Sequence, residues 1–295
     1  MSSKKDFLER HSIKQLLKTT LHHNIENIAT HLKAFLQTKD PESLHQYRVY
    51  IRTARSICLE FSEFMDEKRQ FVLDKTLKVL QQETNDMRDL DVFLESLDAY
   101  KQSVDEAYLS DFEHLQAQVL AEKKEAYRSF EVKFSPKLQA KIIEELEELQ
   151  NDEKLCLPKS DEKLFRHVKA IIEKRLKKIA KLSKKLDMES SNEQFHKLRL
   201  HYKKLRYTCD ALSLKQFAKS FKPIQTAFGK VQDKNTQIAR IKRYNSANSA
   251  ALQQIIALLE EEIDTDKRVC IEKSTKEVLQ TMHEKFEKIL TCKES

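Results

Sequence analysis

An all-helical fold is predicted by three features of the sequence. The chain has one glycine and four prolines in 295 residues, far fewer turn-forming residues than a protein of short strands needs. Apolar residues recur at steps of three and four over long segments, and this spacing is typical of one face of an α-helix. One charged helical segment also occurs twice, which indicates an internal duplication.

Charge and cysteine content narrow the class of protein. The chain carries 54 Lys and Arg against 47 Asp and Glu, a net charge of +7, which favours an anionic partner without identifying one. The N-terminus has no apolar signal-peptide core, and no apolar run reaches the roughly 20 residues that span a membrane. We therefore expect a soluble cytoplasmic protein. An odd number of cysteines without CxxC spacing predicts reduced thiols at Cys58, Cys156, Cys209, Cys270 and Cys292.

The first predicted helix has an apolar face, and a second helix starts soon after it. Asp40-Pro41-Glu42 supplies an N-cap, a proline in the first turn and an acidic charge, which together start a helix. The apolar face of the first helix consists of Ile13, Leu17, Leu21, Ile25, Ile28, Leu32 and Phe35. The apolar side of the second consists of Tyr47, Ile51, Ala54 and Cys58.

The second helix carries a cationic face opposite its apolar side. In the segment HQYRVYIRTAR, one histidine and three arginines stand at offsets of zero, three, seven and ten, within an arc of roughly 80° of helix. These residues are His45, Arg48, Arg52 and Arg55. A second segment, HKLRLHYKKLR, repeats the offsets with His196, Arg199, Lys203 and Arg206.

The rest of the first half is predicted to form three more helices. A break near 65–68 precedes a helix from about Phe71 to Tyr100, and Pro136 divides the polar helical region from Val104 to Asn151. The segment from Cys156 to Asp161, with a proline and the predicted helix cap Ser160, is the predicted boundary between two halves. One face of the helix from Phe71 carries Lys78, Gln81, Asn85 and Asp89.

A basic helix is predicted at the start of the second half. Between Asp161 and Leu186, ten Lys and Arg face three acids. Arg175 falls in the middle of the apolar stripe, where a guanidinium is costly to bury without an anion. It is expected either to point into a binding site or to pair with a buried carboxylate in the bundle.

The two halves align as a tandem duplication. The motif histidines differ by 151 positions, and beyond the motif the offset becomes 144, which matches Lys78 with Lys222, Gln81 with Gln225 and Asp89 with Asp233. We predict two related helical bundles packed about a pseudo-twofold axis. The expected boundaries are a single domain over 1–295, an N-terminal repeat over about 7–154 and a C-terminal repeat over about 161–295.

The sequence resembles the CHAD domains, the conserved histidine α-helical domains, over essentially its whole length. The resemblance rests on HQYRVYIRTAR, MRDLDVFL from Met87 to Leu94, FHKLRLHYKKLRY from Phe195 to Tyr207, and FGKVQD around Gly229. It implies two four-helix bundles with pseudo-twofold symmetry and a central basic surface that binds inorganic polyphosphate. It places on that surface His45, Arg48, Arg52, Arg55, His196, Arg199, Lys203 and Arg206, with Lys78 and Lys222 as additions. Arg175 is a further candidate for polyphosphate binding because of its place in the apolar stripe.

The chain departs from the family pattern at two places. Arg52 is followed by Thr53, whereas the second copy keeps a basic pair, Lys203 and Lys204. Arg88 likewise has no basic equivalent, because Gln232 occupies the matching position. We therefore expect a groove whose stronger charge lies on the second half.

Other functions are weighed against polyanion binding. Glu42 with His45, and Glu193 with His196, have the ExxH spacing of di-iron sites, but the neighbouring arginines would repel a metal cation. Acid–base catalysis by Asp89 and Asp91 is disfavoured, because residues two apart point to different sides of a helix. No phosphate loop or catalytic triad is apparent. We expect no enzyme activity, no cofactor and no metal. Nucleic-acid binding and a scaffold for acidic proteins remain the alternatives, and binding to polyphosphate would favour association with polyphosphate granules.

Overall fold

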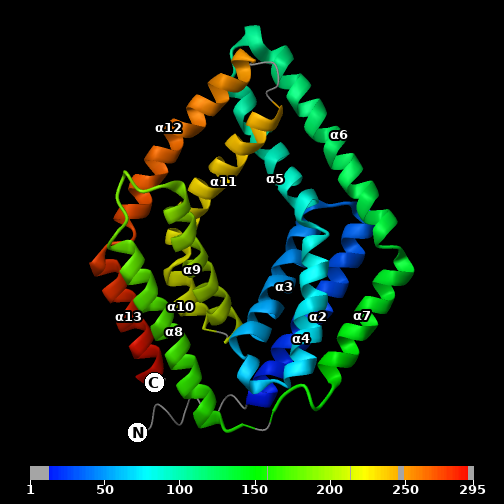
Figure 1. Cartoon of the computed structure of the whole chain (residues 1–295), viewed down its shortest axis with the longest axis vertical. Coiled ribbons are helices and arrows are strands. Elements are labelled where there is room, and N and C mark those ends of the chain that lie inside the picture. The colour runs from blue at the N-terminus through cyan, green and yellow to red at the C-terminus, as the bar shows by residue number, and fades with distance from the viewer. Residues whose placement is uncertain (1–12, 158, 213, 245–248, 292–295) are drawn as a thin grey trace.

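The computed structural model describes residues 13–157, 159–212, 214–244 and 249–291, and these form helices without a β-strand (Figure 1). The all-helical prediction is confirmed. The N-terminal half contains α2 (Ile13–Thr38), α3 (Pro41–Glu60), α4 (Glu67–Gln82), α5 (Asn85–Tyr100), α6 (Leu109–Lys133) and α7 (Pro136–Asn151), with short 3-10 turns at Ser62–Phe64, Lys101–Ser103 and Glu106–Tyr108. The C-terminal half contains α8 (Asp161–Ser183), α9 (Asn192–Ala211), α10 (Lys215–Ser220), α11 (Lys222–Tyr244), α12 (Ala250–Glu272) and α13 (Lys276–Thr291).

Side-chain caps start several of these helices where the sequence predicts a start. The Asp40 carboxylate accepts hydrogen bonds from the backbone N–H groups of Glu42 and Ser43, at 3.2 and 2.9 Å, at the start of α3. Ser160 accepts from the backbone N–H of Lys163 at 3.3 Å and starts α8. Such caps satisfy backbone donors that have no partner within the helix. The starts of α3 and α8 are thus encoded locally.

One predicted helix is interrupted. The sequence predicts a continuous helix from about Phe71 to Tyr100, but α4 ends at Gln82 and α5 begins at Asn85. Thr84 is fully buried at this break, and its hydroxyl donates to the carbonyl oxygen of Gln81 at 3.0 Å. The corresponding part of the second half lies in the unbroken helix α11.

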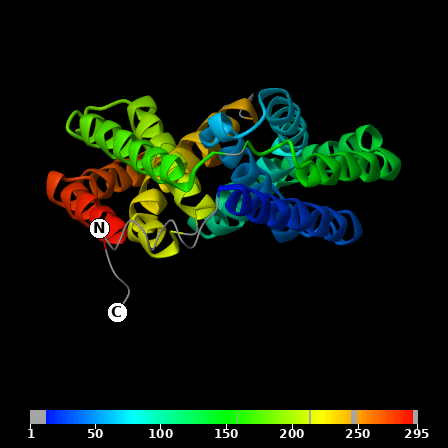
Figure 2. The same ribbon diagram turned by 90° about the horizontal axis from the view of Figure 1, so that it is seen from below.

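The halves lie on either side of the molecule and meet at more than one place (Figures 1 and 2). Helices α2, α3, α4 and α7 gather on one side, and α8, α9, α10 and α13 on the other, while α5, α6, α11 and α12 reach toward the far end of the molecule (Figure 1). Helix α3 packs against α9. Near the far end, the rings of Phe93 and Tyr244 stack at 6.5 Å, and the Gln237 side chain bonds to Tyr100 and Ser96. The pseudo-twofold relation between the halves and their exact boundaries stay predictions.

The motif helices are anchored by their apolar sides. Tyr47, Ile51, Ala54 and Cys58 on α3 are at most 1% exposed, as the sequence predicts. Tyr202 and Leu205 on α9 are completely buried. Burying each large apolar side chain contributes about 1.5–3 kcal/mol to stability. The cationic faces are therefore held by substantial packing on the opposite side.

Two sequence-based expectations fall partly outside the described residues. Cys58, Cys209 and Cys270 are free and buried, and Cys156 is buried, whereas Cys292 and the N-terminal residues 1–12 lie outside the described part of the chain. Among the helices that are described, none is both long and apolar enough to cross a membrane.

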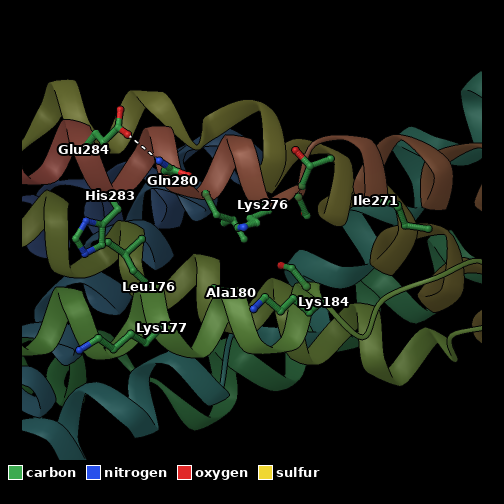
Figure 3. Close-up of a pocket in the computed structure, with 13 residues that line it drawn as sticks. Leu176, Lys177, Ala180, Lys184, Ile271, Lys276, Gln280, His283 and Glu284 are labelled. Atoms are coloured by element: carbon green, nitrogen blue, oxygen red, sulfur yellow. Dashed lines mark hydrogen bonds between the residues drawn. The ribbon is translucent and has the colours of Figure 1, made fainter.

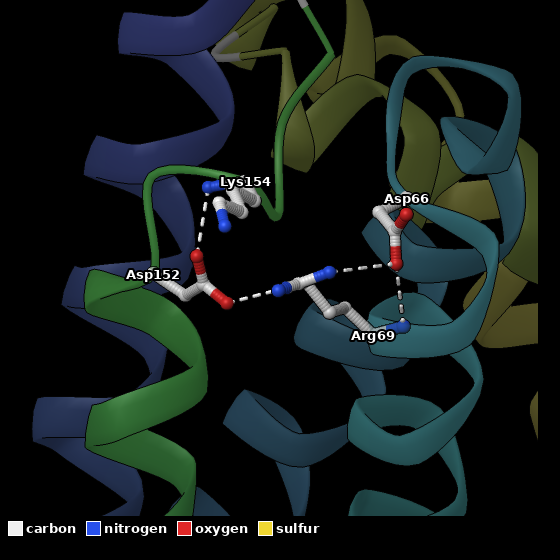
Figure 4. Close-up of polar contacts among 4 residues, drawn as sticks. All are labelled: Asp66, Arg69, Asp152 and Lys154. Atoms are coloured by element: carbon white, nitrogen blue, oxygen red, sulfur yellow. Dashed lines mark hydrogen bonds and ion pairs between the residues drawn. The ribbon is translucent and has the colours of Figure 1, made fainter.

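The segment that joins the halves is attached to the first half. Arg69 at the start of α4 bonds through its guanidinium to Asp152, just beyond α7, and to Asp66 (Figure 4). Backbone hydrogen bonds reinforce this clamp, from Asp66 N–H to the Leu155 carbonyl at 2.8 Å and from Leu157 N–H to the Phe64 carbonyl at 2.9 Å. The first part of the linker therefore follows a fixed path along α4.

Replacing Arg69 with Ala should lower the melting temperature at pH 7 and make stability less sensitive to acid. A side-chain hydrogen bond from Arg69 lowers the pKa of Asp152. The backbone N–H of Arg69, and then its guanidinium, lower the pKa of Asp66. Carboxylates with a lowered pKa contribute stability above the ordinary Asp pKa of about 3.9, and that contribution is lost as the pH falls through the folded-state value. Thermal unfolding at pH 7 and pH 3 should show the gap between wild type and Arg69→Ala closing in acid.

Arg166→Ala provides the control for this measurement, since Arg166 is an exposed arginine on α8. It should leave the melting temperature nearly unchanged at both pH values. A gap for Arg69→Ala that is as large in acid as at neutral pH would rule out the clamp as its cause.

Candidate functional site

Cations from the two motif helices meet where α3 packs against α9. We call the eight residues His45, Arg48, Arg52, Arg55, His196, Arg199, Lys203 and Arg206 the motif face. Arg52 of α3 lies close enough to Lys203 and Tyr207 of α9 to shift the pKa of both side chains. The structure thus brings residues of both motif copies into one cluster.

The electrostatics of this cluster are dominated by positive charge. Burial lowers the pKa of Lys203, and the nearby Arg199, Arg52 and Arg206 lower it further, although Tyr207 opposes them. Burial alone would raise the pKa of Tyr207, yet Arg52, Lys203 and Arg206 together bring it below its ordinary value. Such shifts arise where cations exceed the nearby acids. An anion placed here would relieve the repulsion.

Two arginines of the cluster retain unused hydrogen-bonding capacity. The Nε atoms of Arg52 and Arg206 are buried without a hydrogen-bond partner. Within the described structure, Arg52 forms neither an ion pair nor a hydrogen bond, and Arg206 has a long ion pair to Asp210 at 3.8 Å and lies over the Tyr207 ring at 5.1 Å. A buried donor without an acceptor is costly, so both side chains would gain from an oxygen-rich ligand.

Arg48 lies on the motif face by sequence but is bound within its own half. It is 7% exposed, and its guanidinium donates to the Gln81 carbonyl at 3.0 Å, the Thr84 hydroxyl at 2.9 Å and the Asn85 side-chain oxygen at 2.8 Å. These acceptors lie at the break between α4 and α5. Arg48 therefore stabilises the broken helix, whereas its counterpart Arg199 has only a long ion pair to Asp233 at 3.7 Å.

The remaining motif residues occupy the flanks of the cluster. Arg55 is held by Asp74 and Gln81, both at 2.9 Å. The His196 ring is hydrogen-bonded through Nδ1 to the Gln232 side chain. Burial and the nearby charge of Arg88 lower the pKa of His45. Both effects favour the neutral form of the His45 imidazole when no ligand is bound.

The three candidates outside the motifs are placed differently. Lys78 on α4 and Lys222 on α11 are exposed, and neither has an ion-pair partner among the described residues. The structure does not bring Arg175 to the motif face. Its guanidinium pairs with Glu60, the last residue of α3, which matches the alternative of a carboxylate partner.

A small pocket between the halves contains one carboxylate from each. Asp89 of α5 and Asp233 of α11 line a pocket of about 200 Å³ together with Arg240, which lies over the Phe93 ring at 5.7 Å. Burial raises the pKa of both carboxyl groups, and the charge of Asp89 adds to the effect on Asp233. Arg48 and Arg199 act on them in the opposite direction. Asp233 thus has a long ion pair with Arg199 at 3.7 Å, whereas Asp89 interacts with Arg48 through charge alone.

Arg240 is a buried cation that sequence reasoning did not identify. It is 7% exposed, and one of its terminal nitrogens has no hydrogen-bond partner. The offset of 144 matches Arg240 with Ser96, so the comparison of the two repeats gives no signal for it.

Two larger pockets border α8. One, of about 570 Å³, is lined by Arg175, Glu60 and His201 and by several lysines; we call it the α8 pocket. The other, of about 550 Å³, lies between α8 and α13 and contains Leu176 and Ala180 together with Lys184 and Lys276 (Figure 3). Neither pocket contains a residue of the motif face. Across the part of the chain that is described, no group of three or more His, Cys, Asp or Glu side chains is arranged to hold a metal ion.

The fold and the motif face define an all-helical protein with a cationic cluster where its halves meet, and comparison with known proteins gives its family. The CHAD domain family matches residues 19–242. The chain therefore belongs to the CHAD domain family. Among solved structures, it is similar to PptA from Streptomyces chartreusis, with a TM-score of 0.66 and 16% identity over 93% of this chain and 100% of that one.

A plant structure gives the same result for the fold. The CHAD domain from Ricinus communis has a TM-score of 0.65 and 18% identity, over 88% of this chain and 92% of that one. No curated protein sequence matches the chain significantly. The similarity thus extends beyond the motifs to almost the whole fold.

Arg48→Gln and Arg199→Gln should differ sharply in their effect on stability. The first change leaves the acceptors at the α4–α5 break without their buried partner, which we expect to cost about 2–4 kcal/mol. The second removes a long, partly exposed ion pair and should cost less than about 1 kcal/mol. Urea unfolding of the two variants measures both values, and equal losses would contradict a special structural role for Arg48.

Proposed function

We propose that this protein binds inorganic polyphosphate on the motif face and that it does so as a binding protein without catalytic activity. The observation that carries this proposal is the meeting of Arg52 with Lys203 and Arg206, contributed by both halves, in a cluster with unused guanidinium donors. Membership of the CHAD family supports polyphosphate as the anion. A location in the cytoplasm, with recruitment to polyphosphate granules, would agree with such binding.

The dimensions of the motif face favour a chain of phosphates over a single one. The motif extends over ten residues of each helix, which corresponds to about 15 Å at 1.5 Å per residue. Arginine forks match phosphate oxygens in pairs, and lysine adds a mobile point charge. Two rows of such groups can contact several phosphates of one polymer at once.

Nucleic acid is the second candidate, because its backbone is also a row of phosphates. Base recognition usually adds aromatic stacking. Tyr47 and Tyr202 are buried, and Tyr207 is only 8% exposed, so these tyrosines cannot offer an open stacking surface. This observation favours a polymer without bases.

Arg52→Gln combined with Lys203→Gln should weaken binding of long-chain polyphosphate at least about tenfold. Each phosphate contact contributes about 0.7 to the slope of log Kd against log salt, so the loss of two contacts should reduce this slope by about 1.5. Titrations at several salt concentrations, with circular dichroism to verify folding, provide the measurement. Duplex DNA and single-stranded RNA of matched charge should bind more weakly to the wild type.

A matched control uses Lys68→Gln and Lys137→Gln, which remove two positive charges from exposed positions on α4 and α7. This variant should retain nearly full affinity. If both double variants lose affinity equally, or if DNA and RNA bind as tightly as polyphosphate, the motif face is not a specific polyphosphate site.

Polyphosphate binding should take up protons near pH 6.5 through His45. In the free protein, burial together with Arg88, Arg52 and Arg48 lowers the pKa of His45, while Glu42 opposes them. A bound polyanion favours the protonated imidazole and raises this pKa, so affinity should increase as the pH falls from 7.5 to 6. Calorimetry in two buffers of different ionisation enthalpy should show less proton uptake for His45→Gln. Identical uptake by both proteins would exclude His45 as the responsible group.

A further inference from the structure

The α8 pocket collects more positive charge than its surroundings compensate. Five cations contribute to its wall, and Glu60 is the only carboxylate among the lining residues. Glu60 is already paired with Arg175. The lysines are Lys174, Lys177, Lys178 and Lys181.

These four lysines are exposed, and none has an ion-pair partner among the described residues. Each of them has another of the four either three or four residues away along α8. Like charges at this spacing repel one another and destabilise a helix. The four lysines therefore destabilise α8 through charge repulsion, and an anion in the pocket would offset this repulsion.

Helix α9 contributes one residue to the wall of the same pocket and two lysines near that residue. His201 lines the pocket, and burial followed by the charges of Lys204, Lys178, Arg175 and Lys197 lowers its pKa. Lys204 is the second base of the pair that distinguishes the second motif copy from the first. It therefore acts on the α8 pocket, whereas Lys203 lies in the cluster with Arg52.

The first half provides an internal comparison, because its helix α2 aligns with α8 at the offset of 151. The positions of Lys174, Lys177, Lys178 and Lys181 correspond to His23, Glu26, Asn27 and Thr30. His201 corresponds to Tyr50, whose ring contacts those of His23 and His31 at 5.8 and 5.5 Å. The shared helical scaffold therefore does not require the lysines, and the charge is particular to the second half.

We propose that the α8 pocket is a second binding site for a phosphate chain, separate from the motif face, and that long polyphosphate gains affinity by occupying both. Ammonium groups are compact, mobile charges that neutralise closely spaced phosphates, and Arg175, held by Glu60, contributes a fixed charge to the wall. Joining two sites through one flexible polymer raises affinity without a new contact. The choice of ligand rests on the proposed function, whereas the existence of the site rests on the pocket itself.

Tripolyphosphate is a suitable probe, because it is too short to bridge the motif face and the α8 pocket as a long polymer would. Isothermal titration should give two molecules per wild-type chain, and one for the variant Lys174→Gln, Lys178→Gln and Lys181→Gln. Long-chain polyphosphate should bind this variant at least about tenfold more weakly. The motif variant Arg52→Gln with Lys203→Gln should also bind one tripolyphosphate, at the α8 pocket.

The control replaces three exposed lysines elsewhere, Lys68, Lys137 and Lys285, with Gln, and it should still bind two molecules. One tripolyphosphate per wild-type chain, two in the α8 variant, or an equal loss in the control would overturn the second site. Equal competition by polyglutamate of matched charge would overturn the choice of phosphate and indicate an acidic protein. If the motif variant retains both sites while the α8 variant loses one, the proposed function fails and the second site stands.

Discussion

Mutual repulsion among the cations of α3 and α9 is opposed by the apolar sides of the same two helices. Two unit charges about 8 Å apart repel by about 2 kcal/mol at an effective dielectric constant of about 20. Each helix buries several large side chains, such as Tyr47 and Tyr202, and each of these contributes about 1.5–3 kcal/mol. The packing therefore outweighs the repulsion and keeps a cationic surface in place before any anion arrives.

Residues that the predicted repeats place at matching positions have different partners in the two halves. Arg48 fastens the break between α4 and α5, whereas Arg199 remains near the surface beside Asp233. The unbroken α11 has no such break for Arg199 to fasten. The extra base in the second motif does not simply strengthen the central cluster, because Lys204 acts on His201 at another pocket. The positive charge of the second half is thus distributed over two surfaces.

Features that depend on neighbouring residues were predictable from the sequence. Asp40 and Ser160 start helices because they bond to backbone groups only two or three residues away. The turn after α4 was not predictable, because Arg48, 36 residues before Thr84, holds it. For Arg175, the apolar stripe showed that a partner was needed, but only the fold reveals that Glu60 provides it. Residue types therefore predicted the chemistry of the candidate site, and tertiary contacts decided which cations stay open to a ligand.

The clamp on the linker also bears on the order in which the chain can fold during synthesis. The Asp152 side chain and the backbone groups of Leu155 and Leu157 bond to partners that precede them in the sequence, namely Arg69, Asp66 and Phe64. All of these groups precede α8 in the chain and therefore leave the ribosome before it. The nascent first half can therefore form the bonds at its C-terminal end first, and these bonds fix the direction in which the second half emerges. The ion pair between Glu60 and Arg175 forms later, once α8 is present.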